Sequence, residues 1–247
     1  MKKLWKGRMV KKYSWVIPTK AELKELVDDD QIESLTIKVT CELIEPMLGT
    51  IPKNPKIFTD FVSQKMGDFQ GEKLKTMEEL DEEVVSCPDK AEKSATGFHK
   101  DTFGLCIYNY MILGNIKANL FILMSNGLGK VLNYKKSTDL FVKVNPRKIR
   151  FYDHKDEDEK PLMSPDGQIE RSLRVQTAKG ERVALAKSDY IEAKTRFKFE
   201  VRLLRNDRGL DMEMLVNAIK MGKENGLGQW RGSGGYGKYK ILSLKYV

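Results

Sequence analysis

The chain has 247 residues, of which 40% are hydrophobic, and 44 basic against 35 acidic residues give a formal net charge of +9. This length suits one large domain or two small ones, and the hydrophobic share argues against a globally disordered chain. The positive charge favours a polyanionic partner without identifying it. With two histidines and three cysteines that lack C-x-x-C spacing, the sequence predicts free thiols, no metal site and no cofactor.

The basic start of the chain is not followed by an apolar h-region, and no run approaches the roughly 20 apolar residues that a membrane span needs. We therefore expect a cytoplasmic protein. Residues 1–33 are predicted to form a basic arm, in which lysines and an arginine surround Trp5, Tyr13 and Trp15. That mixture suits a nucleic-acid strand, and it suits an edge hairpin or a subunit-docking arm equally well.

A single domain is predicted from residue 34 to residue 247. Its first strand, Ser34 to Ile44, alternates apolar and polar residues, which places Cys41 in the core. The segment 53–100 is predicted to be a helical and acidic insertion, with a helix at Lys56 to Met66 and then an acidic helix and an exposed linker. Its run of acidic side chains is typical of a solvated surface and would repel phosphate.

The next stretch combines a polar loop, a strand and an apolar helix. His99 lies in the predicted loop Thr96 to Asp101 and is a weak candidate for phosphodiester cleavage, although a lone loop histidine is more often a hydrogen-bonding bystander. A strand is predicted at Leu105 to Ile112. Gly114 then precedes an apolar helix with Lys117 near its start, a place that suits an anion, while core packing is the simpler explanation.

The second half of the chain predicts more strands. Leu140 to Phe151 is a strong strand in which Pro146 marks a bend or an edge. Ile169 to Arg182 is a cationic, hairpin-like stretch whose Arg171 and Arg174 could hold a backbone phosphate or simply face solvent. Tyr190 to Leu204 is the clearest strand, and Gly209 to Met221 is an amphipathic helix. This order predicts an α+β fold with a largely antiparallel sheet, for which a split β-α-β arrangement is a natural choice.

A glycine-rich stretch, Gly226 to Lys240, precedes the predicted last strand, Tyr239 to Val247. Glycine lets the backbone approach a partner closely, and successive N–H groups of such a loop can bind an anion. Cationic and aromatic side chains beside it suit phosphates and exposed bases. The nucleic-acid candidates in this stretch are Trp230, Arg231, Tyr236, Lys238, Gly226, Gly228, Gly234, Gly235 and Gly237. A tight structural turn is the alternative.

Three of these stretches together resemble the RAMP superfamily, the ferredoxin-like, RRM-like proteins of CRISPR effectors, and above all their guide-RNA-binding backbone subunits. The stretches are G-L-G-Q-W-R-G-S-G-G-Y-G-K-Y, the arginine-containing hairpin followed by S-D-Y-I-E-A-K-T-R-F, and M-I-L-G-N-I-K-A-N-L. The resemblance implies a ferredoxin-like sheet with helices on one face. It also implies that Lys117, Arg171, Arg174 and the glycine loop lie near RNA. A stand-alone or phage-encoded relative is compatible with it.

The sequence is compatible with three alternative functions. The first is a non-catalytic protein that binds single-stranded nucleic acid, RNA ahead of DNA, and assembles side by side with copies of itself and with other RAMP or CRISPR-type subunits. The second is a protein-interaction or structural assembly module without nucleic acid, such as a viral subunit or a mimic of a host RAMP protein. The third is a metal-independent endoribonuclease with His99 in the active site.

Overall fold

The computed structural model describes residues 33–53, 95–154, 160–177 and 180–247, although not the side chains of residues 172–185. The basic arm and most of the predicted insertion lie outside these ranges. The described part is an α+β structure with a seven-stranded and a five-stranded sheet. No helix of this part is long and apolar enough to cross a membrane.

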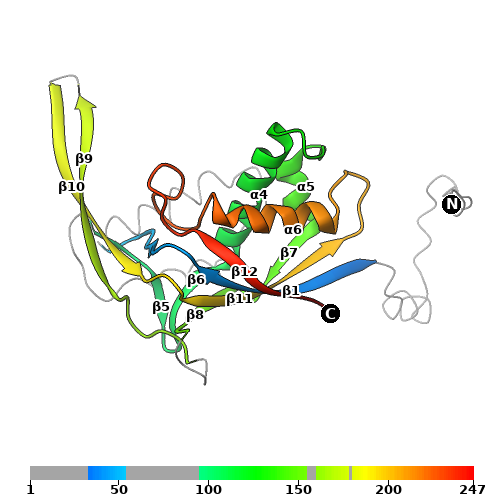
Figure 1. The fold of residues 1–247 in the computed structure, drawn as a ribbon, viewed down its shortest axis with the longest axis horizontal. Helices are drawn as coiled ribbons and strands as arrows, with labels where there is room; N and C mark the ends of the chain where they lie inside the picture. Colours follow the sequence, from blue (N-terminus) through cyan, green and yellow to red (C-terminus); the bar gives the residue numbers. More distant parts are fainter. Residues whose placement is uncertain (1–32, 54–94, 155–159, 178–179) are drawn as a thin grey trace, which may run out of the picture. The chain divides into compact units, whose positions relative to one another are not determined.

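The larger sheet has ferredoxin-like topology, as predicted (Figure 1). Its central strands lie in the order β12-β1-β11-β7, and each neighbouring pair is antiparallel. The β-α-β-β-α-β elements, in chain order, are β1 (Ser34–Leu43), α4 (Asn109–Ser125), β7 (Val142–Asn145), β11 (Arg196–Leu204), α6 (Met212–Lys220) and β12 (Tyr239–Tyr246). A helix α5 (Tyr134–Phe141) precedes β7, and a short 3-10 helix, η2 (Met221–Lys223), follows α6.

The larger sheet continues beyond β7. The predicted strand from Leu140 to Phe151 is divided at Pro146 into β7 and β8 (Lys148–Tyr152), and both pair with β11. Strand β8 also pairs with β6 (Gly104–Tyr108), which forms a hairpin with β5 (His99–Asp101). The predicted bend at Pro146 is therefore the point at which the strand breaks.

The core lies between the larger sheet and its helices. Alternate residues of β1 and β11 are buried, among them Ile37, Val39 and Phe199, and they join the apolar sides of α4 and α6 in one cluster. The intervening residues of these strands lie on the opposite, open face of the sheet. Helix α6 begins after Asp211, whose carboxylate accepts a hydrogen bond from the Met214 N–H at 2.8 Å.

The smaller sheet contains the predicted cationic hairpin. Its strands are β2 (Met47–Leu48), β3 (Ile51–Pro52), β4 (Ala95–Gly97), β9 (Gly167–Thr177) and β10 (Gly180–Ile191). Strands β9 and β10 pair along their whole length, from Gly167 opposite Tyr190 to Thr177 opposite Gly180. The hairpin prediction is therefore confirmed in its backbone. The predicted strand from Tyr190 to Leu204 is two strands, because Lys194 turns the chain with a left-handed φ of +70°.

Three predictions about α4 and the residues before it were wrong. The predicted strand Leu105 to Ile112 ends at Tyr108, and the helix begins at Asn109. Lys117 therefore lies in the middle of α4 rather than near its N-terminus. Thr96 to Asp101 belongs largely to strands β4 and β5 rather than to a loop. A short apolar run fits both the helical and the strand periodicity, and here the pairing of distant segments determines which of the two forms.

Candidate nucleic-acid interface

The glycine-rich loop between η2 and β12 is closed at its base by contacts between backbones. The Leu227 N–H donates to the Gly237 carbonyl at 2.9 Å, and the Gly237 N–H donates to the Pro46 carbonyl at 2.8 Å. A Cβ at Gly226 would overlap the Gly237 backbone, and one at Gly237, where φ is +68°, would overlap the Leu227 carbonyl. These two glycines are therefore required by the fold of the loop itself.

The other candidate glycines divide into two groups. Gly228 has a φ of +83°, and a Cβ there would lie 2.5 Å from the Leu48 carbonyl oxygen of β2. A Cβ at Gly234 would lie 2.5 Å from the Trp230 carbonyl oxygen. Gly235 has a φ of +73° but open space around it. Close packing thus explains the glycine at 226, 228, 234 and 237, and the tip alone has room for a ligand.

Several N–H groups of the loop are bonded within the protein. The N–H groups of Leu227, Gln229, Gly235, Tyr236 and Gly237 all donate to backbone carbonyls of the protein. The expected anion-binding concavity of successive N–H groups is therefore absent at these five positions. At these five positions an anion can be bound only by side chains.

Two buried asparagines of α4 hold the start of the loop. Asn115 Nδ2 donates to the carbonyls of Asn225 and Gly226 at 3.0 and 2.8 Å, and its Oδ1 accepts a bond from the Tyr239 hydroxyl at 2.8 Å. Asn119 Oδ1 accepts a bond from Asn225 Nδ2 at 2.7 Å. Both asparagines are fully buried. Neither asparagine was predicted from the sequence to be functional, although two asparagines four residues apart in an apolar helix are a visible signal.

Above this base, Arg171 of β9 meets the two aromatic side chains of the loop. Its Cζ lies 4.1 Å from the centre of the Trp230 ring and 5.6 Å from the centre of the Tyr236 ring. Trp230 is 40% exposed and has a left-handed φ of +56°. Three of the predicted binding residues therefore come together, and we call Arg171, Trp230 and Tyr236 the loop cluster.

The guanidinium of the loop cluster is only partly satisfied. Its Nη2 donates to Ser188 Oγ at 3.1 Å. Its Nε and Nη1 are buried and have no hydrogen-bond partner among the described residues. Burial lowers the pKa of Arg171, with Tyr236 acting in the opposite direction. Buried donors without partners are costly, and a shift of the side chain toward solvent would let an oxyanion satisfy them.

A polar network positions Arg171 from below. Ser188 Oγ and Thr96 Oγ1 lie 2.9 Å apart, and both donate to Gln229 Oε1 at 3.2 Å. Next to Ser188, the buried Asp189 carboxylate accepts bonds from Lys53 Nζ at 2.7 Å and from Gln168 Nε2 at 3.0 Å. The network joins β4, β9, β10 and the loop. None of these six supporting residues was predicted from the sequence to belong to a site.

The remaining predicted residues lie elsewhere or make fewer contacts. Lys117 forms an ion pair with Asp139 of α5 at 2.5 Å. Arg174 lies in β9 opposite Val183, but its side chain is not described. Arg231 and Lys238 are half-buried residues of the loop. His99 is 2% exposed, and its ring contacts the edge of Tyr108 at 4.5 Å between centroids. This buried position does not suit attack on an RNA backbone.

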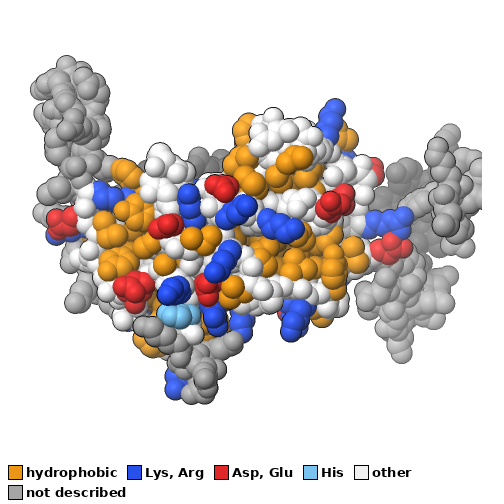
Figure 2. Space-filling model, in the orientation of Figure 1, with side chains coloured by type: hydrophobic (Ala, Val, Ile, Leu, Met, Phe, Trp, Pro, Cys, Tyr) orange, Lys and Arg blue, Asp and Glu red, His pale blue; other side chains and the backbone are white. Residues whose placement is uncertain are grey.

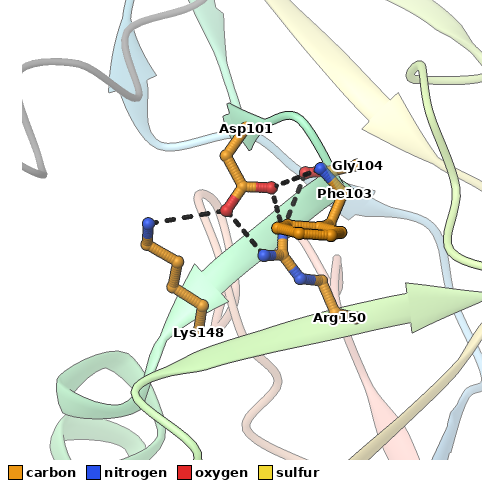
Figure 3. Close-up of polar contacts among 5 residues, drawn as sticks. All are labelled: Asp101, Phe103, Gly104, Lys148 and Arg150. Carbon is orange, nitrogen blue, oxygen red and sulfur yellow. Dashed lines mark hydrogen bonds and ion pairs between the residues drawn. The ribbon is translucent and has the colours of Figure 1, made fainter.

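A second charged cluster closes the β5–β6 hairpin (Figure 3). Asp101 accepts bonds from both terminal nitrogens of Arg150 at 2.6 Å and from the Phe103 N–H at 2.9 Å, and Lys148 Nζ lies 3.5 Å away. Burial raises the pKa of Asp101, but the bonds from Arg150 and Phe103 and the charges of Arg150 and Lys148 outweigh it and lower the pKa overall. The carboxylate is satisfied, so we assign it a structural role.

Charge on the surface is mixed. Lys and Arg side chains are spread over the face of Figure 2, with Asp and Glu between them. The net charge of +9 is therefore not concentrated in one uniform patch of this face. A binding site must therefore be identified from the local arrangement of side chains rather than from the total charge of the protein.

No protein-family model matches the chain, and no curated protein matches its sequence. Among solved structures, the chain is similar to a chain in the cryo-EM structure of the Type III-B Cmr-beta bound to cognate target RNA. The sequence identity is 13% and the TM-score is 0.43. The similarity covers 92% of this chain and 64% of that chain, so it spans less than two thirds of the latter.

Proposed function

We propose that this chain is a RAMP-type protein that binds single-stranded nucleic acid, RNA ahead of DNA, without cleaving it. The observation that carries the proposal is the loop cluster. A guanidinium with two unsatisfied donors lies against an exposed indole on a glycine-rich loop. Phosphate oxygens match the donors of arginine, and bases match the exposed ring.

A single strand fits this arrangement better than a duplex. Trp230 is 40% exposed, and a base can stack on it only where the base is not already stacked in a helix. The open space beside Gly232 and Gly235 lets a backbone approach the tip of the loop. Because such contacts recognise the faces of bases and the phosphates, binding would depend little on sequence.

Assembly along the strand belongs to the same proposal and rests on the sequence resemblance. Side-by-side copies would each contribute one loop cluster to a continuous track, and other RAMP or CRISPR-type subunits would be further partners. Light scattering of the protein with and without single-stranded RNA tests this part. A particle mass that grows in steps with RNA length is expected, and one protein per RNA at every length would reject assembly.

The binding claim is tested by fluorescence anisotropy with a short labelled RNA and the DNA of the same sequence. Arg171→Ala removes the guanidinium, and Arg171→Lys keeps the charge but removes the planar group. Arg208, exposed and paired with Asp207 at 3.3 Å, provides matched control variants. Losing a charge-assisted bond of about 1.5–3 kcal/mol weakens binding roughly ten- to hundredfold. Unchanged RNA affinity in Arg171→Ala would reject the site.

A further inference from the structure

The open face of the larger sheet carries a separate set of cations. Strand register places Lys38 of β1 between Lys245 of β12 and Glu200 of β11. One step along β1, Thr40 lies between Ser243 of β12 and Lys198 of β11. Residues at every second position share a face, so these six side chains lie together, opposite the buried Val39 and Phe199.

The surface is hollowed at this place. A groove of about 500 Å³ is lined by polar residues of β1, β11 and β12, namely Lys38, Thr40, Lys198, Glu200, Ser243 and Lys245, and by Asn145 and Pro146 at the break between β7 and β8. Phe199 also borders it, but its side chain is 2% exposed and stacks on Phe197 in the core. Three lysines, two hydroxyl groups, one amide and the Glu200 carboxylate therefore make up the polar lining.

The groove holds one carboxylate, Glu200, and it lies beside Lys38. Lys38 Nζ lies 3.3 Å from Glu200, in a pair that is about half exposed. Lys245 lies directly opposite Lys38, and no carboxylate in the described ranges is within ion-pair distance of it. Like charges directly opposite each other on neighbouring strands are destabilising. A bound anion would reverse that repulsion.

The lining also indicates the kind of anion. Lysine ammonium groups act as point charges for phosphate, and hydroxyl and amide groups donate to its remaining oxygens. Among the residues that line the groove, the only aromatic one has its ring in the core, so bases have no ring to stack on. The lining of the groove therefore suits phosphates better than bases, in contrast to the loop cluster.

We propose that this groove is a second binding site, which takes consecutive phosphate groups. Either the backbone of an oligonucleotide or the polyphosphate of a free nucleotide supplies that chemistry. The inference stands on residues that the loop cluster does not use. It holds or fails independently of the function proposed above.

The test measures tripolyphosphate binding by isothermal titration calorimetry at low salt. The groove variant is Lys198→Gln with Lys245→Gln, which keeps the side-chain stems. The control is Lys220→Gln with Lys223→Gln, which removes the same charge from two exposed lysines of α6 and η2. We expect the groove variant to bind at least about fivefold more weakly, the control to bind like the wild type, and Arg171→Ala to leave tripolyphosphate binding unchanged.

The same variants distinguish the source of the phosphates. If a nucleic-acid backbone occupies the groove, the salt dependence of oligonucleotide binding also becomes shallower by about 1.4 in log–log slope, since two contacts are lost. If only tripolyphosphate binding falls, the ligand is a free polyphosphate. Ser243→Glu, which adds a carboxylate at the groove wall, serves as a second variant with the same expected loss. Undetectable binding to the wild type, or equal losses in groove and control variants, would overturn the proposal.

Discussion

The guanidinium carbon of Arg171 lies over the ring of Trp230, 4.1 Å from the centre of the ring. One residue comes from β9 of the smaller sheet, and the other comes from the loop that enters β12 of the larger sheet. Their contact therefore joins the two sheets at the proposed binding surface. Since an isolated cation–π contact is worth about 0.5–1 kcal/mol when exposed, its main consequence is to orient both groups for a ligand.

Trp230→Ala is expected to weaken binding of single-stranded RNA. Base stacking on an aromatic side chain contributes about 1–3 kcal/mol per base, so the dissociation constant should rise roughly five- to hundredfold. Trp230→Phe keeps a ring and should lose less. Tyr246→Ala, at a 68% exposed tyrosine near the end of β12, is the control and should bind like the wild type. Equal losses in the Trp230 and Tyr246 variants would assign the effect to general surface change.

Gly237→Ala should destabilise the protein, whereas Gly232→Ala should not. A Cβ at Gly237 overlaps the Leu227 carbonyl at a positive φ, while nothing lies within 4 Å of a Cβ at Gly232. We expect Gly237→Ala to lower the free energy of unfolding by at least about 1 kcal/mol. Urea unfolding followed by circular dichroism measures both. Similar stabilities of the two variants would contradict the backbone contacts assigned to the loop base.

Lys53→Met tests the buried ion pair beneath the loop cluster. Lys53 and Asp189 side chains are each 6% exposed and lie 2.7 Å apart, so the variant leaves an uncompensated buried carboxylate. The expected loss in unfolding free energy is about 3–5 kcal/mol. Lys38→Met breaks the exposed pair with Glu200 and should change stability by less than about 1 kcal/mol. Equal effects of the two variants would show that the Lys53 pair is accessible to water.

Asp101→Asn should reveal a pH-dependent contribution to stability. The pKa of Asp101 is lowered in the folded protein, so its stabilisation is present above the ordinary carboxyl pKa and is lost as the pH falls through the folded-state value. At neutral pH the variant should be less stable by about 1–3 kcal/mol. The gap should close in acid, at a pH below about 4. A gap that stays constant across this range would contradict the ionised cluster in Figure 3.

The element order was predictable because the strongest patterns are local. Alternation identified β1 and β11, and amphipathic spacing identified α6. The start of α4 was not predictable, because the residues from Asn109 to Ile112 fit both the helical and the strand periodicity of apolar residues. In the structure the Asn109 N–H donates a hydrogen bond to the Arg147 carbonyl at 2.8 Å. Tertiary pairing, rather than propensity, sets that boundary.

The candidate site was predictable in its residues but not in its geometry. Arg171, Trp230 and Tyr236 were chosen for their chemistry, and their contact depends on how the two sheets meet. Lys117 was chosen because it was expected near the start of a helix, whereas it lies in the middle of α4. The supporting residues Thr96 and Ser188 carried no signal, because ordinary hydroxyl side chains become a network only when distant strands pair.

The most direct test of the central claim is a double-mutant cycle on RNA affinity with Arg171→Ala, Trp230→Ala and the double variant. If the two residues form one binding site, each single variant weakens binding, and the double variant loses less than the sum by about 0.5–3 kcal/mol. Circular dichroism of all three variants confirms that they are folded. Losses that simply add would contradict a shared site, and wild-type affinity in all three would contradict nucleic-acid binding by the loop cluster.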